Sequence, residues 1–579
     1  MAYSLVRNSL LIAGVLLVPF LFGDYWAFQL SLVYLFAIVS LGIGVCWGQA
    51  GFLSLGQGMF LGLGAYISGL SLVHFGSSPW IWLLLPAAIL IPGVLAYVIG
   101  LAVFRGRTES GPFFALITLA MTLLAFQIAN TWNSVTGGFN GLKNIPDLPG
   151  FGGYSERYYL AGVALIGAVA IVAWLINAPI GVVWRALAEN ERRISFFGYR
   201  TSQLKAVAFG IAGLLAGLAG FLYAPQQNLV TPTLAGFLIS ADIVIWAAVG
   251  GRKSILGPAL GAIVIGVLTT ELRDRVAVWE VIVALIFIIV VLYLPGGFTG
   301  LFSRIHTHLS KYGRRAEATI QAPPGLANDS SAPALVVENC DLNVGEVHIL
   351  DDLSFTIEKQ AIYCLIGPNG AGKTSTFNAL TGELKMQSGK VRLDGEIVTS
   401  LPAHKMAQRG IGRKFQIPSV FPGLSIQDNL HIALWGARAS LWDLLRPSLR
   451  RWDTPVLASL RDRFSFLLDG QQIAGALSHG ERQILELAMA LAGEPRLLLL
   501  DEPCAGLSND DTRLVIDTIS WAKEELSLTI IVIEHDMTLV RKIADHVFVM
   551  HQGHLLAEGD VQSIQADERV HQVYVGMVT

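Results

Sequence analysis

Gly367-Pro368-Asn369-Gly370-Ala371-Gly372-Lys373-Thr374-Ser375 stands between an apolar run, residues 362–366, and a stretch of helix-forming residues. A short apolar run of this kind is typical of a buried strand. The glycines let successive backbone N–H groups close on a phosphate group, and a helix that begins at the loop presents its positive end to the same anion. A chance glycine-rich turn would lack the flanking strand and helix. The stretch therefore predicts a phosphate-binding loop in an α/β domain.

Side chains in and near this loop suggest how a nucleotide is held. Lys373 is expected to reach the β- and γ-phosphates, and Thr374 offers a hydroxyl group to Mg²⁺. A second buried strand, residues 497–500, ends in Asp501 and Glu502. At a strand end both carboxylates can serve one site, Asp501 toward Mg²⁺ and Glu502 toward an attacking water. The sequence therefore predicts ATP and Mg²⁺ as ligands.

The composition shows that this α/β domain is only part of the protein. The chain has 579 residues, of which 53% are hydrophobic and 14% are charged. Soluble domains carry nearer a quarter of charged residues, so a large part of the chain is expected to lie in lipid. The net charge of -3 gives no indication of a nucleic-acid partner. The four cysteines are scattered, so neither a disulfide framework nor a metal site is predicted from them.

Apolar stretches of spanning length fill the first half of the chain. A spanning helix needs about 20 largely apolar residues. The candidate spans lie near residues 9–23, 26–46, 57–75, 80–104, 112–132, 159–178, 204–225, 238–250, 255–270 and 277–294. The first, eighth and ninth are short, so about 8–10 helices are expected, and the first is interpreted as an uncleaved helix rather than a signal peptide. The sequence predicts an all-α membrane domain over residues 1–302, a solvated linker over 303–334 and the α/β domain over 335–579.

Charge predicts the orientation of these spans. The phosphate-binding domain must lie where ATP is, so the last span should end in the cytoplasm. Counting back places Arg105, Arg107, residues 185–200 and Arg252-Lys253 inside, which agrees with the positive-inside rule. Arg273 and Arg275 fall outside and disagree with it, although acidic Glu271 and Asp274 beside them can offset their charge, and the ninth span can instead be re-entrant.

Small and polar residues predict contacts within the membrane domain. Gly213, Gly217 and Gly220, with alanines between them, form a face on which helices can approach closely. Polar residues at membrane depth are expected to face the interior, where they are candidates for the translocation path. These candidates are Ser54, Gln57, Thr118, Gln127, Asn130 and Asp242. An interfacial position at a helix end explains Asp242 equally well.

Several features of the C-terminal part follow one another in the order and spacing of one family. After the loop at residues 367–375 come Gln416, then Leu477-Ser478-His479-Gly480-Glu481, then Asp501-Glu502, and finally His535. Gln416 alone would be an ordinary loop residue, and His535 alone an ordinary surface histidine. Together the features resemble the ABC ATPases across residues 335–579. The resemblance implies that two such domains sandwich two ATP molecules.

The same resemblance implies a role for each matching residue. Glu502, His535 and Gln416 take the places of the catalytic glutamate, the switch histidine and the Q-loop residue. Thr374, Gln416 and Asp501 take the places of the Mg²⁺ ligands. The nucleotide is implied to bind the whole loop from Gly367 to Ser375, and the signature residues Ser478, His479 and Gly480 are implied to meet the nucleotide of the partner ATPase subunit.

Three positions depart from the family pattern. Val344 stands where the family usually stacks an aromatic ring on adenine, although His348 is close by. The signature carries His479 and Glu481 in place of the usual Gly and Gln, and Glu481 would put a carboxylate near phosphate unless it is turned away. Ser508 replaces the usual D-loop aspartate. These departures indicate an ATPase that works as one partner of an asymmetric pair.

The membrane part also resembles a known family. Residues 48–58, Thr136-Gly-Gly-Phe-Asn-Gly141, residues 185–191 and Pro295-Gly-Gly297 are similar to the permeases of branched-chain amino acid and urea importers. The resemblance implies a second permease subunit, a periplasmic substrate-binding protein, a small polar solute and contact with membrane lipid of the inner membrane, but no nucleic acid. It also implies that residues 186–200 form a coupling helix that docks on the ATPase near the Q-loop.

Three functions are compatible with these features to different degrees. The first is an ATP-driven importer of urea, a short amide or a branched-chain or hydrophobic amino acid. The second is an exporter half-transporter, whose six long helices and cytoplasmic extensions fit less well. The third, a soluble regulatory or DNA-repair ATPase, disagrees with the apolar spans. Within the first, residues 412–416, 420–421, 249–252 and 278–280, together with His479, resemble the urea-type subunits, so urea or a short amide is the expected substrate.

Overall fold

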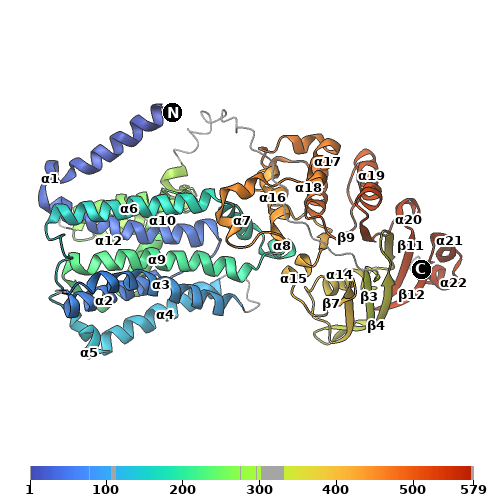
Figure 1. The fold of residues 1–579 in the computed structure, drawn as a ribbon, viewed down its shortest axis with the longest axis horizontal. Helices are drawn as coiled ribbons and strands as arrows, with labels where there is room; N and C mark the ends of the chain where they lie inside the picture. The colour runs from blue at the N-terminus through green and yellow to red at the C-terminus, as the bar shows by residue number, and fades with distance from the viewer. Residues whose placement is uncertain are drawn as a thin grey trace. The chain divides into compact units, whose positions relative to one another are not determined.

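The computed structural model describes residues 2–76, 78–105, 112–273, 275–294, 296–300 and 332–575 (Figure 1). The chain divides into two compact units. One unit comprises Met1–Ala188 and Ser202–Ala316, and the other comprises Glu189–Thr201 and Glu317–Thr579. Arg107, Asp274, Pro295 and nearly all of the predicted linker lie outside the described residues. The predicted limits of the linker therefore stay a prediction.

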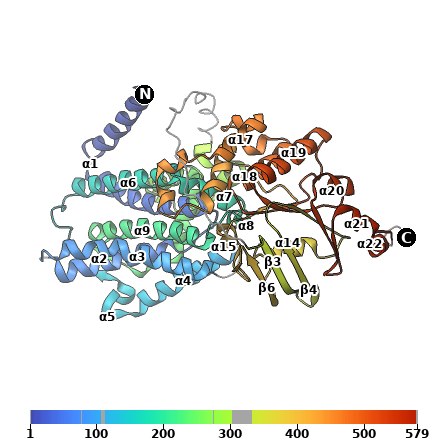
Figure 2. The ribbon, with the colours of Figure 1, turned by 45° about the vertical axis from the view of Figure 1, so that its right-hand side comes forward.

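The first unit is built from long helices, of which α2, α3 and α9 lie side by side (Figures 1 and 2). Its main helices are α1 (Ala2–Ile43), α2 (Gln57–Phe75), α3 (Ile81–Phe104), α4 (Pro112–Thr131), α6 (Tyr154–Asn177), α7 (Pro179–Glu189), α9 (Thr201–Gln227), α10 (Phe237–Gly250), α11 (Gly257–Arg273) and α12 (Trp279–Tyr293). A π-helical segment, Gly44–Gln49, continues α1, and α5 (Asn133–Thr136) is a single turn. Among its described residues the unit is all-α apart from the two-residue strands β1 (Leu142–Lys143) and β2 (Leu229–Val230), which pair with each other.

All ten predicted spans fall on helices, but fewer helices are long enough to cross a membrane. Within the described residues, six helices meet the length and hydropathy required, and two shorter apolar helices lie at Phe237–Gly250 and Val281–Val290. The first two predicted spans belong to one helix, α1, which is interrupted at Gly23 by a φ of 75°. Helix α10 has 14 residues. At about 1.5 Å per residue it is shorter than the ~30 Å hydrocarbon layer.

The small-residue face of α9 lies where two other helices approach it. A β-carbon at Gly213 would lie 2.7 Å from the Pro92 carbonyl oxygen of α3, and one at Gly217 would lie 2.8 Å from the Ala88 carbonyl oxygen. A β-carbon at Gly220 would lie 2.2 Å from a carbonyl oxygen of α2. No larger residue fits at these distances, so the predicted role of this face in helix packing is confirmed.

The polar residues of the membrane unit do not all face its interior. Ser54, Gln57 and Thr118 are buried, and the Thr118 hydroxyl accepts a hydrogen bond from the Leu55 N–H at 3.0 Å. Gln127 and Asp242 are exposed on this chain. These two side chains therefore do not face the interior of this unit, because burial depends on which helix face is covered, and the assignment of all six candidates to the translocation path stays a prediction. Outside the spans, Arg275 lies 2.8 Å from Glu271, which confirms that Glu271 offsets its charge.

The second unit contains two sheets. A six-stranded sheet has the order β12-β11-β5-β10-β9-β8, parallel except for the β11–β12 pair. A four-stranded antiparallel sheet has the order β4-β3-β6-β7. The strands are β3 (Leu335–Val344), β4 (Val347–Ile357), β5 (Ile362–Ile366), β6 (Ser388–Leu393), β7 (Glu396–Ile397), β8 (Ile411–Lys414), β9 (Leu497–Asp501), β10 (Thr529–Ile533), β11 (His546–His551) and β12 (His554–Gly559). The two sheets lie on the right of Figure 2.

Helices of the second unit pack around these sheets. They are α8 (Glu191–Phe196), α14 (Lys373–Leu380), α15 (Ala403–Gln408), α16 (Ile426–Gly436), α17 (Pro455–Arg463), α18 (His479–Ala492), α19 (Asn509–Glu525), α20 (Met537–Ile543), α21 (Val561–Ala566) and α22 (Glu568–Val575). The central strands β5, β9 and β10 are buried along their whole length, as parallel strands covered on both faces must be. Because these three strands are neighbours and parallel, their carboxyl ends meet at one edge of the sheet.

Candidate nucleotide site

The glycine-rich loop follows the carboxyl end of β5. Gly367, Gly370 and Gly372 have φ values of 148°, 84° and 100°, which only glycine adopts readily. A β-carbon at Gly367 would also lie 2.2 Å from the Met550 carbonyl oxygen. Lys373 begins α14, and its Nζ donates hydrogen bonds to the carbonyl oxygens of Gly367 and Pro368 at 2.7 and 2.9 Å. The loop thus curves around the lysine ammonium group.

Opposite charges face each other across this loop. Burial lowers the pKa of Lys373, and the carboxylates of Glu502 and Asp501 oppose that shift. Burial also raises the pKa of Asp501, which the Arg413 guanidinium opposes and the Glu502 carboxylate reinforces. Burying each of these groups costs least free energy when an opposite charge lies beside it. A bound phosphate would supply the negative charge for Lys373, and its cation would supply the positive charge for Asp501.

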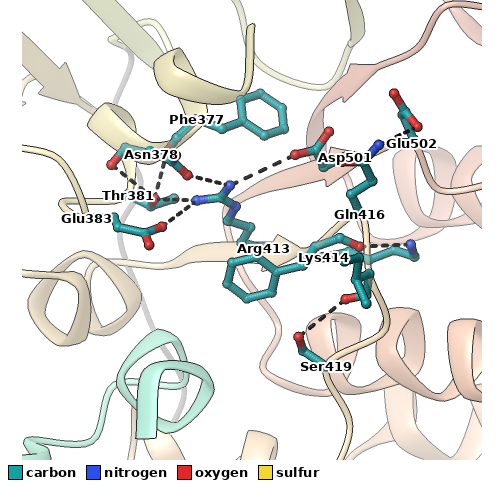
Figure 3. A network of polar contacts seen from close by, with 12 residues as sticks. Phe377, Asn378, Thr381, Glu383, Arg413, Lys414, Gln416, Ser419, Asp501 and Glu502 are labelled. Atoms are coloured by element: carbon teal, nitrogen blue, oxygen red, sulfur yellow. Dashed lines mark hydrogen bonds and ion pairs between the residues drawn. The ribbon is translucent and has the colours of Figure 1, made fainter. Parts of the chain in front are cut away.

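Two of the three predicted catalytic side chains converge on the carboxylate of the third, Glu502. The Gln416 Nε2 donates a hydrogen bond of 2.9 Å to Glu502 Oε2 (Figure 3). The His535 Nδ1 lies 3.5 Å from Glu502 Oε1. Glu502 itself has a φ of 44°, and its backbone N–H donates to the Ile533 carbonyl oxygen at 3.0 Å. The turn after β9 therefore aims the carboxylate toward residues that follow β8 and β10.

The predicted metal ligands line one cavity. Thr374, Gln416 and Asp501 all border a space of about 370 Å³ in the second unit. A hydroxyl, an amide oxygen and a carboxylate are hard oxygen donors, which Mg²⁺ prefers and usually supplements with water and phosphate oxygens. The residues present therefore fit a Mg²⁺ ion.

The signature residues lie on another element and none of them lines this cavity. Ser478 caps the N-terminus of α18: its Oγ accepts from the Glu481 N–H at 3.2 Å, and Glu481 Oε2 accepts from the Ser478 N–H at 2.8 Å. This capping box engages the Glu481 carboxylate, which answers the concern that it would face phosphate. His479 and Gly480 form the first turn of α18, where backbone N–H groups are free to meet an anion.

Two known protein families match the two parts of this chain. The family described as "Branched-chain amino acid transport system / permease component" matches residues 25–292, and the ABC transporter family matches residues 350–505. The branched-chain amino acid transport ATP-binding protein BraF of Pseudomonas aeruginosa is 34% identical over 254 residues, which are 42% of this chain and 99% of BraF. LivG of Escherichia coli, with the same description, is 33% identical over 42% of this chain and 99% of LivG.

The chain belongs to the branched-chain amino acid transport family of ABC transporters. It is a fusion of the permease and ATP-binding parts of that family, and its ATPase hydrolyses ATP in support of transport. Its spanning helices make it a multi-pass inner-membrane protein whose ATPase domain lies in the cytoplasm. The lipopolysaccharide export ATP-binding protein LptB of Haemophilus influenzae is also similar, 32% identical over 42% of this chain and 97% of LptB. The ATPase of this family therefore does not by itself reveal the direction of transport.

Residues 189–201 of this ABC transporter pack with its ATPase in one compact unit. The Tyr199 hydroxyl donates to the Ile432 carbonyl oxygen at 3.0 Å, and the Gln408 Nε2 donates to the Gly198 carbonyl oxygen at 2.8 Å. The Phe196 ring meets the Phe415 ring edge to face at 5.0 Å. Because Phe415 precedes Gln416, these contacts confirm that the segment docks beside the Q-loop. We call residues 189–201 the coupling segment.

One residue of the site was not expected from the sequence to act there. In the sequence, Arg413 belongs to a run, residues 412–416, that resembles the urea-type subunits. It is 3% exposed and donates through Nη1 to Thr381 Oγ1 at 3.0 Å and through Nη2 to Asn378 Oδ1 at 2.7 Å. Burial lowers the pKa of Arg413 to about 10, against the opposing effect of Glu383 and Asp501, so the group stays charged at neutral pH. No local pattern indicates that this strand residue turns toward Asp501.

The other two departures from the ABC pattern are Val344 and Ser508, and the structure shows what each of them contacts. Val344 is 46% exposed at the end of β3, and His348 pairs across the hairpin with Asn343. Ser508 caps α19, because its Oγ accepts from the Asp511 N–H at 3.2 Å and donates to the Asp511 carboxylate at 2.7 Å. A serine at this position therefore stabilises a helix end.

Proposed function

We propose that this chain is one half of an importer that uses ATP hydrolysis to move a small polar nutrient into the cytoplasm. The observation that carries the proposal is the fusion itself: a permease of the branched-chain amino acid type and an ABC ATPase share one chain, with the coupling segment held beside the Q-loop. An exporter half-transporter is the alternative. The permease match favours import, whereas the ATPase, which also resembles an export protein, is neutral.

We infer that the residues of the nucleotide site divide into phosphate-binding, Mg²⁺-binding and catalytic groups. The loop from Gly367 to Ser375 holds the phosphates through backbone N–H groups and the Lys373 ammonium group. Thr374, Gln416 and Asp501 would hold Mg²⁺, which when bound would neutralise phosphate charge. Glu502 orients the attacking water and accepts its proton, and His535 and Gln416 hold the Glu502 carboxylate in place.

The assembly needs more than this chain. A nucleotide sandwich uses two ATPases and two permeases, and this chain carries one of each. Ser478, His479 and Gly480 lie on a helix end that does not line the cavity of their own chain, which supports their contact with the nucleotide of a second ATPase subunit. We infer a second permease subunit, a second ATPase subunit and a periplasmic substrate-binding protein as partners. Val344 and Ser508 support an asymmetric pair.

We infer urea or a short amide as the solute, with a branched-chain amino acid as the second candidate. Among the described residues of the first unit, the buried polar side chains other than Lys205 carry only hydroxyl or amide groups. Gln57 is fully buried, and both of its amide atoms are without a hydrogen-bond partner. Neutral groups of this kind suit a neutral amide, which needs hydrogen bonds rather than a charge pair. The names of the relatives instead favour branched-chain amino acids.

Uptake by cells tests both the import and the substrate. We expect that cells carrying the gene take up labelled urea and that cells lacking it do not, while uptake of labelled leucine is equal in both. Cells that carry the Glu502→Gln variant serve as the control, because we expect their transporter to assemble but to turn over ATP about 100-fold or more slowly. If leucine uptake depends on the gene and urea uptake does not, the substrate is an amino acid and the importer stands. If neither solute enters in a gene-dependent way but a solute leaves, the protein is an exporter.

A charge reversal in the coupling segment tests the coupling. Glu189 Oε2 accepts a hydrogen bond from the Gly423 N–H at 3.2 Å. A lysine cannot accept this bond, and a hydrogen bond to a charged group contributes about 1.5–3 kcal/mol. We expect Glu189→Lys to lower transport about tenfold or more while ATP hydrolysis continues. Transport and ATPase rates are measured on the same proteoliposomes, with Glu346→Lys at an exposed position as the control. Equal loss of both rates in an assembled complex would indicate a structural role for Glu189.

A further inference from the structure

Arg413 forms hydrogen bonds through its backbone carbonyl oxygen and through its guanidinium group. Its carbonyl oxygen accepts a hydrogen bond of 2.7 Å from Nη1 of Arg193, a residue of the coupling segment. Its guanidinium group reaches the other way, to Asn378 and Thr381 near the end of α14, and Nη2 lies 4.0 Å from Asp501 Oδ2 (Figure 3). One residue therefore contacts the coupling segment, the helix that begins at the phosphate loop, and the strand end that carries the predicted Mg²⁺ ligand.

Aromatic rings make a second set of contacts to the same group. The Arg413 guanidinium carbon lies 5.6, 5.9 and 4.7 Å from the ring centres of Phe196, Phe377 and Phe415. Phe196 belongs to α8, Phe377 to α14, and Phe415 precedes Gln416. A desolvated cation near ring faces is attracted to each of them. A shift of α8 would therefore displace the Arg413 guanidinium group through the ring of Phe196 as well as through the backbone of Arg413.

Ion pairs hold the coupling segment on both sides of residues 413–415. Arg192 forms an ion pair with Glu383, whose Oε2 lies 3.4 Å from Arg413 Nη1. Arg193 is buried and lies 3.4 Å from Glu486 Oε1, and the same oxygen accepts a hydrogen bond from the Phe415 N–H at 3.1 Å. The end of β8 is thus clamped between two pairs that both originate in α8. A movement of α8 should therefore move the end of β8 with it.

We propose that Arg413 is a positioning residue that transmits the position of α8 to α14 and Asp501, and transmits nucleotide binding back to α8. This inference rests on the proposed coupling function and names the residue that performs it. Arginine suits the task because its planar fork donates to Thr381 from Nη1 and to Asn378 from Nη2 in a fixed geometry, whereas a lysine offers a single ammonium nitrogen on a flexible stem. Leaving a buried charge without partners is costly, so the partners and the guanidinium group must move together.

The experiment measures whether nucleotide binding changes the hydrogen–deuterium exchange of the coupling segment. Coupling between two sites is reciprocal, so MgATP should change the behaviour of α8 even without transport. The full chain is purified in lipid nanodiscs as the Glu502→Gln variant, which we expect to bind ATP without turning it over. Hydrogen–deuterium exchange is then measured by mass spectrometry with and without MgATP. We expect exchange in residues 190–197 to slow about fivefold or more on addition of MgATP. The same experiment reports nucleotide binding through residues 367–376.

Two substitutions and one control separate transmission from stability. In Arg413→Met, MgATP should still protect residues 367–376 but no longer slow exchange in residues 190–197. Arg413→Lys should behave in the same way, and it carries the test if the methionine variant does not fold. Arg438→Met is the matched control, because Arg438 has a side chain 1% exposed and pairs with Glu494 at 2.7 Å in the same domain. The control should keep the full response of residues 190–197.

Each contrary result overturns the proposal for a distinct reason. An unchanged response in both Arg413 variants would mean that another route links the sites. Loss of protection at residues 367–376 would place Arg413 in nucleotide binding itself. Loss of the response in Arg438→Met would show that it follows general stability, and no response in the parent chain would exclude the linkage. None of these results depends on the substrate or the direction of transport, which the uptake experiment decides separately.

Discussion

Replacement of Glu502 by glutamine is expected to lower the steady-state ATPase rate of the assembled complex about 100-fold or more while ATP binding persists. A positioned general base contributes about 10²- to 10⁴-fold to a rate. Glutamine has nearly the same shape as glutamate but cannot accept the proton of the attacking water. Its amide oxygen can still accept the hydrogen bond that Gln416 donates at 2.9 Å, so the surrounding loop should keep its structure.

The test compares two measurements on the same complex. Phosphate release gives the turnover, and titration with a fluorescent ATP analogue gives the affinity. Glu524→Gln is the control, since Glu524 is an exposed glutamate on α19 of the same domain. A turnover close to that of the parent would remove Glu502 from the chemistry. An affinity that falls as far as the turnover would instead place Glu502 in nucleotide binding.

Replacement of Lys373 by alanine is expected to act on the earlier step and weaken ATP binding about 10- to 100-fold. The lysine contributes charge-assisted hydrogen bonds to phosphate, each worth about 1.5–3 kcal/mol. The structure adds a second reason: its Nζ also donates to the carbonyl oxygens of Gly367 and Pro368, so alanine removes the group around which the loop curves. The loop then loses both its charge and its support.

Titration of the purified full chain with the same fluorescent ATP analogue measures this effect. Lys385→Ala removes an exposed lysine of the same domain and should leave the affinity within about twofold of the parent, since surface charges contribute little. An unchanged affinity in Lys373→Ala would contradict the assignment of the loop. A loss that occurs equally in Lys385→Ala would show that net charge, rather than the position of Lys373, controls binding.

The convergence of the site was predictable in part. The loop after β5, the carboxylates after β9 and His535 after β10 each follow an apolar run, and neighbouring parallel strands bring such ends to one edge. The capping box of Ser478 and Glu481 also has a readable signal, Ser followed three residues later by Glu, which explains why that carboxylate is engaged.

By itself, the sequence determined the features that rest on local geometry: a glycine loop that needs positive φ, apolar runs of membrane length, and small residues spaced along one face of α9. Only the tertiary structure decided which polar residues are exposed and that Arg413 faces Asp501. These depend on contacts between residues far apart in the chain, such as Arg193 with the carbonyl oxygen of Arg413. The physical reason is that periodicity and backbone preference act within a few residues, whereas the partner of a buried charge is set by how whole elements pack.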